Sequence, residues 1–206
     1  NERNQLAQIV APRLPYPKEA AQFGYDADTW RVLTDAVFPS AKTVTSVVLA
    51  LAYCKVRKLD VMKRPIHIVP IWDSNRKCEV ETIWPGIGEL RTTAARTGSY
   101  GGKDATEFGP DMTREFGPDK DGEKMTVTFP EWGRLTVYRM VGGERCAFVG
   151  PKVYWLESYA TRNYFSDVPN SMWGKERPRG QLEKCVEAAS LRGAFPEELG
   201  NEFAAE

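Results

Sequence analysis

Segments that alternate apolar and polar residues occur in adjacent pairs along the chain, and a short polar turn joins the two members of each pair. Residues 65–72 (PIHIVPIW) and 78–84 (CEVETIW) flank the turn DSNRK, and residues 134–140 (RLTVYRM) are linked to residues 145–150 (RCAFVG) across two glycines. A connection this short joins neighbouring strands only in antiparallel orientation, because a parallel pair needs a crossover of about a dozen residues. With a further strand at residues 125–129 (MTVTF), the pattern predicts a mainly antiparallel sheet containing β-hairpins.

Helical periodicity appears between these strands. Residues 27–38 have a helical pattern, and residues 43–58 repeat apolar side chains at helical spacing, with Ser40 placed to cap this second helix. Residues 86–97 predict a helix that Gly98 ends, and two more helices follow a basic, proline-broken loop near the carboxyl end. Helices packed on a mainly antiparallel sheet place the chain in the α+β class.

The length of 206 residues suits one sizeable core, so we expect a single domain over residues 1–206. Clustered prolines predict that residues 1–26 form an irregular amino-terminal arm. Residues 100–122 are rich in glycine, aspartate and proline and lack periodicity, which predicts a loop that is mobile or contacts a partner.

The composition excludes several functional classes. Twenty-eight basic and 28 acidic residues give no net charge, so any attraction for an anion must come from a local cluster. One histidine and four cysteines without a CxxC pair leave no zinc site, and we expect free thiols. The sequence shows neither a signal peptide nor an apolar run long enough to cross a bilayer, so we expect a soluble protein in the cytoplasm.

Two local clusters of basic residues stand out. The first, KVRKLDVMKR at residues 55–64, contains five basic residues and one acid, ends at Arg64, and is followed by Arg76 and Lys77 in the DSNRK turn. A solvated helix end would account for this cluster equally well, because cations near a helix carboxyl end complement its dipole.

The second cluster lies at the start of the helix predicted after the proline-broken loop near the carboxyl end. Cations at the start of a helix are unfavourable unless an anion binds there. Lys175, Arg177 and Arg179 precede or begin this helix. On a helical wheel Gln181, Lys184, Ala188 and Arg192 fall on one flank, with Glu183 and Glu187 on the other side of an apolar stripe. A phosphate backbone could approach such a basic flank closely, although incidental sorting on a surface helix is the alternative.

Aromatic residues lie among these charges, and stacking on the bases of a single strand would suit them. Most are expected in the core, with one or two reaching a base, and Trp173 is included in the candidate site. The aromatic residues considered are Trp72, Trp84, Tyr154, Trp155, Tyr164, Phe165 and Trp173.

Sequence patterns that would indicate catalysis are weaker than the two basic clusters. Glu79 and Glu81 share one strand face, as the carboxylates of a Mg²⁺-dependent nuclease would, but such alternation also marks the solvated face of a sheet. No Walker-type phosphate loop is present. The residues alone therefore leave three classes open: a nucleic-acid-binding protein, a Mg²⁺-dependent nuclease, and an oligomeric scaffold whose charges pair between subunits.

Longer stretches carry a resemblance to a known family. KLDVMKRPIHIVPIW, then GIGELRTTAARTGSYGG, and then W-x₄-P-R-x₂-L ahead of a helix ending LRGAFPEE occur in this order from about Val32 to the end. In these stretches the chain resembles the RecT/Red beta (Bet) family of phage single-strand annealing proteins.

The resemblance implies an ATP-independent recombinase, not an enzyme, that coats single-stranded DNA as an oligomeric ring or helical filament and anneals it to a complementary strand during homologous recombination. It implies no required cofactor, with Mg²⁺ assisting annealing, and it implies a phage exonuclease and the host single-strand-binding protein as partners. By motif position, Arg64, Arg179, Lys184 and Arg192 match basic residues of the DNA groove. The candidate DNA-binding residues are Arg64, Arg76, Lys77, Trp173, Lys175, Arg177, Arg179, Gln181, Lys184 and Arg192.

Overall fold

The structure is a computed structural model that describes residues 13–163 and 165–200. Its contacts group these residues into two compact units, residues 13–89 and residues 90–200. Both combine helices with antiparallel strands, which confirms the α+β class. The units are defined by contacts rather than by independent folding, so the single domain stays a prediction. Within the described residues, no helix is long and apolar enough to span a membrane.

The first unit consists of short helices followed by one hairpin. Its elements are α2 (Lys18–Ala21), α3 (Ala27–Val32), the π-helical turn η1 (Leu33–Val37), α4 (Val44–Val56), the 3₁₀ turn η2 (Val61–Lys63), β1 (Ile66–Asp73) and β2 (Cys78–Pro85). Strands β1 and β2 pair antiparallel from Ile66 opposite Pro85 to Asp73 opposite Cys78, which confirms the hairpin around DSNRK.

The start of α4 differs from the expectation. Thr43, not Ser40, caps the helix, because its hydroxyl accepts the backbone N–H of Ser46. The Ser40 hydroxyl instead donates to the carbonyl oxygen of Ile68 on β1. The predicted cap was therefore three residues early, and Ser40 ties the segment before the helix to the hairpin.

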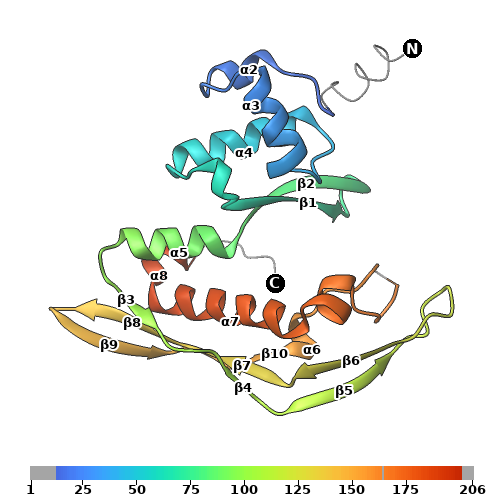
Figure 1. The fold of residues 1–206 in the computed structure, drawn as a ribbon, viewed down its shortest axis with the longest axis vertical. Helices are drawn as coiled ribbons and strands as arrows, with labels where there is room; N and C mark the ends of the chain where they lie inside the picture. Colours follow the sequence, from blue (N-terminus) through green and yellow to red (C-terminus); the bar gives the residue numbers. More distant parts are fainter. Residues whose placement is uncertain (1–12, 164, 201–206) are drawn as a thin grey trace. The chain divides into compact units, whose positions relative to one another are not determined.

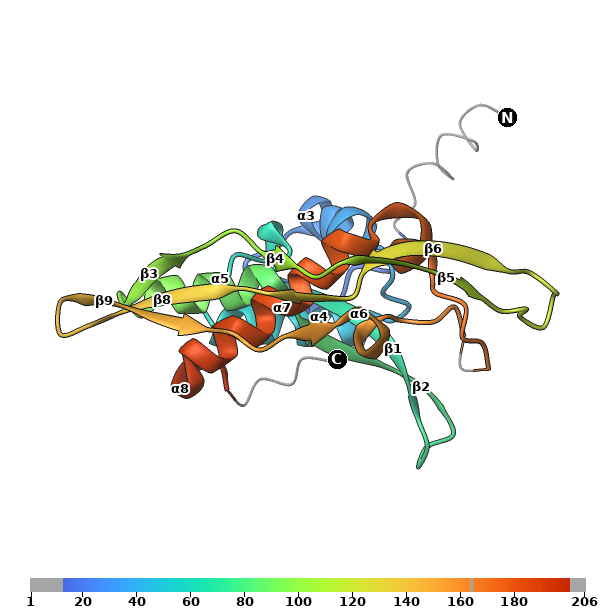
Figure 2. The ribbon, with the colours of Figure 1, turned by 90° about the horizontal axis from the view of Figure 1, so that it is seen from below.

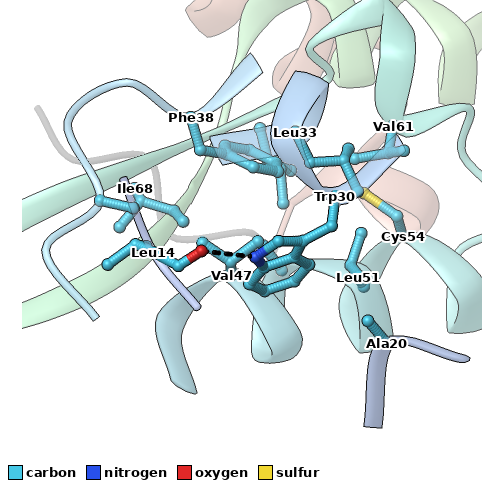
Figure 3. Packing of buried hydrophobic residues seen from close by; sticks show 13 residues of the cluster. Leu14, Ala20, Trp30, Leu33, Phe38, Val47, Leu51, Cys54, Val61 and Ile68 are labelled. Carbon is cyan, nitrogen blue, oxygen red and sulfur yellow. Dashed lines mark hydrogen bonds between the residues drawn. The ribbon is translucent and has the colours of Figure 1, made fainter. Parts of the chain in front are cut away.

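A compact apolar cluster holds the first unit together (Figure 3). Trp30 is fully buried at its centre, and its indole N–H donates to the carbonyl oxygen of Leu14 at 3.1 Å. Leu14 and Ala20 are themselves buried. Residues 13–26 therefore contribute to the core, which an irregular arm was not expected to do, and they contain the short helix α2 directly after Pro17. The rest of the arm lies outside the described residues.

Helix α5 (Ile87–Arg96) begins in the first unit and continues into the second. Gly98 follows it with a φ of +71°, a left-handed conformation that glycine adopts at little cost, so the predicted helix end is confirmed.

The second unit is built on antiparallel strands that one long helix covers. The strands are β3 (Tyr100–Lys103), β4 (Glu107–Phe108), β5 (Asp111–Phe116), β6 (Met125–Pro130), β7 (Trp132–Arg134), β8 (Thr136–Val141), β9 (Glu144–Val149) and β10 (Val153–Tyr154). They pair in the orders β3-β8-β9, β10-β7-β4 and β5-β6. The β8–β9 and β5–β6 hairpins extend toward opposite ends of this unit (Figure 2).

The segment predicted as a loop, residues 100–122, was misinterpreted. It contains β3, β4 and β5, and β5 pairs with β6 over its whole length. Only Phe116 among the residues of β5 is buried. A strand exposed on both faces has no reason to alternate apolar and polar residues, so it carried no periodic signal.

Helix α7 (Pro178–Ala194) lies along one face of these strands and contacts β6, β7, β8, β9 and β10 (Figure 1). The remaining elements are α6 (Trp155–Ser158), the π-helical turn η3 (Met172–Glu176) and α8 (Pro196–Leu199). Gly133 of β7 permits the close approach of α7, because a Cβ built at Gly133 would lie 2.7 Å from Cγ2 of Val186.

Candidate nucleic-acid interface

The amino-terminal end of α7 combines a helix dipole with exposed cations. Pro178 occupies the first turn, no side chain caps the helix, and no acid lies in that turn. Lys175, Arg177 and Arg179 are exposed. The unpaired N–H groups of a first helical turn carry partial positive charge, so this end of the helix is suited to an anion.

The carboxylates of α7 are held by neighbouring elements of the same unit. Glu187 is 1% exposed, and its two oxygens accept hydrogen bonds from Arg91, one from Nε at 2.7 Å and one from Nη2 at 2.5 Å. Lys103 of β3 adds an ion pair at 2.9 Å. Burial alone would raise the pKa of Glu187, but the hydrogen bonds from Arg91 and Lys103 lower it. Glu187 therefore stays ionised.

The helical wheel placed Glu187 away from the basic flank but did not indicate its burial, which the paired cations Arg91 and Lys103 make possible. Glu183 remains exposed, and its carboxylate accepts the hydroxyl of Thr106 at 3.2 Å. Both acids of α7 therefore contact α5 or the segment from β3 to β4. Arg91 and Lys103 are partly exposed cations beside α7, and the sequence did not identify them as part of the candidate site. The position of Glu187, on the side of α7 away from the basic flank, was the signal that cations from another element could pair with it there.

Arg179 lies in a defined setting. Its Nη2 donates to Oδ1 of Asp111 at 2.8 Å, and its guanidinium carbon lies 4.8 Å from the centre of the Phe108 ring. Both partners come from the segment that was expected to be a loop. Arg179 and Asp111 each keep 54% of their side chain exposed, so the guanidinium remains accessible to other anions.

The remaining members of the basic flank are less constrained. Lys184 is exposed, and its ammonium donates to Oε1 of Gln181 at 3.3 Å. Gln181 and Arg192 are half-buried. Lys184 and Gln181 therefore lie together on the accessible surface of α7, as the helical wheel predicted.

Trp173 does not present its ring to solvent. It is 7% exposed and packs edge-on against Trp155, with the ring centres 5.6 Å apart. Trp155 is fully buried, stacks on Phe129 at 4.0 Å, and donates its indole N–H to the carbonyl oxygen of Pro178. The two tryptophans therefore support the start of α7, and burial leaves the ring of Trp173 little surface for a base.

Exposed aromatic side chains occur elsewhere. Trp72 is 62% exposed on the β1–β2 hairpin, and Phe165 is 93% exposed in the segment before η3. Tyr164 lies outside the described residues. Either exposed ring is better placed for stacking than Trp173.

The basic candidates of the first unit are all exposed. Arg64 follows η2 in a left-handed conformation, and its guanidinium donates to the carbonyl oxygen of Ala36. Arg76 pairs with Asp73 at 3.5 Å in the hairpin turn, and Lys77 follows with a φ of +52°. These residues are accessible charges on the first unit, and their DNA-binding role stays a prediction.

Glu81 is not part of a solvated strand face. Its oxygens accept the backbone N–H of Lys42 at 2.5 Å, the hydroxyl of Thr43 at 2.7 Å and the hydroxyl of Ser46 at 2.6 Å. Burial alone would raise the pKa of Glu81, but these hydrogen bonds lower it. Glu79 pairs with the ammonium of Lys42 at 2.9 Å. Both carboxylates therefore hold β2 against the start of α4.

Other candidates for metal or redox chemistry are equally weak in the described part of the chain. It contains no group of three or more histidine, cysteine, aspartate or glutamate residues arranged to hold a metal ion. All four cysteines are free, which confirms the predicted thiols. Burial raises the pKa of Cys54 to about 12, so this thiol stays protonated.

Comparison with known families favours one of the three functional classes. The model of the RecT family matches residues 24–206, which is most of the chain. The chain belongs to the RecT family. No curated protein matches the sequence. Membership of the RecT family implies a phage single-strand annealing protein rather than a classical enzyme, and it implies interaction with single-stranded DNA.

Proposed function

We propose that this RecT-family protein grips the backbone of single-stranded DNA along the basic flank of α7 and anneals the strand to its complement without ATP. Arg179, Lys184 and Arg192 supply the contacts, with Lys175, Arg177 and Gln181 beside them. Arg64, Arg76 and Lys77 add contacts from the first unit. One observation carries the proposal. Glu183 and Glu187 form hydrogen bonds or ion pairs with other residues of the second unit, whereas the cations at the start of α7 are exposed.

Contacts to phosphate are largely blind to base sequence. They also leave the base edges free to pair with an incoming strand, which annealing requires. No nucleotide cofactor takes part in this scheme, and Mg²⁺ assists by screening the two approaching strands. The protein acts as a ring or helical filament in the bacterial cytoplasm, together with a phage exonuclease and the host single-strand-binding protein.

Titration of labelled oligonucleotides across several salt concentrations tests the proposal. Arg179→Ala, Lys184→Ala and Arg192→Ala should each weaken binding to two unrelated sequences alike. Each should also reduce the slope of log affinity against log salt by about 0.7, the value for one phosphate contact on a single strand.

Lys120→Ala is the matched control, because Lys120 is an exposed cation of the same unit outside α7. Thermal melting identifies variants that remain folded. Unchanged affinity and slope in all three folded α7 variants would place the DNA elsewhere, and cleavage of the label in Mg²⁺ would favour a nuclease.

A further inference from the structure

Asp111 forms a hydrogen bond with Arg179, the arginine that the proposed function assigns to a DNA phosphate. Its carboxylate lies 2.8 Å from Nη2 of Arg179, at hydrogen-bonding distance for a charged pair. A phosphate oxygen would use the same guanidinium N–H groups. A phosphate that binds the guanidinium through Nη2 therefore has to displace the carboxylate of Asp111.

The pair is built so that it can be exchanged. Both side chains are 54% exposed, and exposed ion pairs contribute little to stability because water and salt screen them. A buried pair would resist exchange, as the pairing of Glu187 with Arg91 and Lys103 illustrates within the same unit.

Phe108 keeps the guanidinium in place during such an exchange. The Arg179 guanidinium carbon lies 4.8 Å from the ring centre, within the range of a cation–π contact. Phe108 is half-buried and pairs through β4 with Gly133 of β7, so its ring is anchored in the sheet. The ring contact is measured at the guanidinium carbon, whereas the carboxylate accepts a hydrogen bond from Nη2.

We propose that Asp111 is a built-in competitor that stands in for a DNA phosphate on Arg179, so that strand binding exchanges the carboxylate for phosphate while Phe108 holds the guanidinium. This inference rests on the proposed function, because it assumes that Arg179 contacts the DNA backbone. Asp111 thus limits the affinity of each subunit, and it favours release of any strand that is not held by several subunits at once.

The test is the affinity of Asp111→Asn for a labelled single-stranded oligonucleotide, measured at low salt against the wild type. Loss of the competitor should tighten binding by about two- to fivefold, the range that corresponds to an exposed ion pair. Glu107→Gln is the matched control: it removes one negative charge from the neighbouring strand β4, where Glu107 pairs with Arg134 at 2.7 Å. That control should tighten binding clearly less, because the described ion pair of Glu107 is with Arg134 and not with Arg179.

The double variant Asp111→Asn/Arg179→Ala makes the test specific. It should bind no more tightly than Arg179→Ala alone, because the competitor acts only through Arg179. An equal gain in Glu107→Gln, or a gain that persists without Arg179, would overturn the inference in favour of a general charge effect.

The remaining outcomes separate the two levels of the proposal. If Arg179→Ala weakens binding but Asp111→Asn leaves it unchanged or weaker, the competitor is refuted and the proposed DNA contact stands. If folded Arg179→Ala binds as the wild type does, the contact itself is refuted, and the role of Asp111 is refuted with it.

Discussion

At the residue scale, Glu81 resembled a metal ligand in the sequence, but its carboxylate instead holds the segment that begins α4, through Lys42, Thr43 and Ser46. Its folded pKa is lowered, so its stabilisation is present above the unfolded value of about 4.3 and is lost as the pH falls through the folded value. Glu81→Gln should lower the free energy of unfolding by about 1–2 kcal/mol near neutral pH. The difference from the wild type should shrink in acid, as urea titrations at several pH values would show.

Glu79→Gln is the control for this prediction, because within the described residues Glu79 loses an exposed ion pair with Lys42 and no buried contact. It should cost well under about 1 kcal/mol. Glu79→Ala combined with Glu81→Ala should leave annealing largely intact in folded protein. Loss of annealing in a folded double variant would give these carboxylates a functional role.

Glu187 gives a second prediction at this scale. Glu187→Gln leaves Arg91 and Lys103 without their buried partner and should destabilise the protein by about 2–3 kcal/mol, below the usual cost of a fully buried pair because both cations reach water. Glu183→Gln removes the same charge from the same helix, but Glu183 is exposed and the amide oxygen of glutamine can still accept the hydroxyl of Thr106, so it should cost far less. Urea denaturation compares the two, and equal losses would contradict the internal role of Glu187.

At the element scale, the sequence predicted the helices and strands in which one buried face makes apolar residues recur at a regular spacing. It missed those in which apolar residues show no such spacing. The β1–β2 hairpin, α4, α5 and the β8–β9 hairpin were predicted correctly, because one face of each is buried or a glycine marks its turn or end. Strand β5 was missed because most of it is exposed. The basic flank of α7 was visible on a helical wheel, whereas Asp111 and Phe108 were hidden in the supposed loop.

The close packing of α7 against β7 gives a prediction at the same scale. Gly133→Ala would place a Cβ 2.7 Å from Val186, which is fully buried and cannot move aside freely. The helix must shift, at a cost of about 1–3 kcal/mol in the free energy of unfolding. Gly180→Ala on α7 meets only Cβ of Arg177 at 3.7 Å, an ordinary contact, and should be neutral or stabilising. Thermal melts that rank the two variants in the opposite order would show that α7 does not lie this close to β7.

At the scale of the whole molecule, the balance of 28 basic and 28 acidic residues gives no net field, so association must depend on how the charges are distributed. We predict that subunits associate head to tail, with acidic residues of one subunit against basic residues of the next. Such heterologous contacts generate rings or open helices rather than closed twofold dimers. Salt should weaken them, because exposed charges are screened over about 10 Å at 0.1 M ionic strength. Light scattering at low and high salt, with and without an oligonucleotide, measures the assembly. A strict monomer in every condition would contradict the prediction, and assemblies insensitive to salt would point to apolar contacts instead.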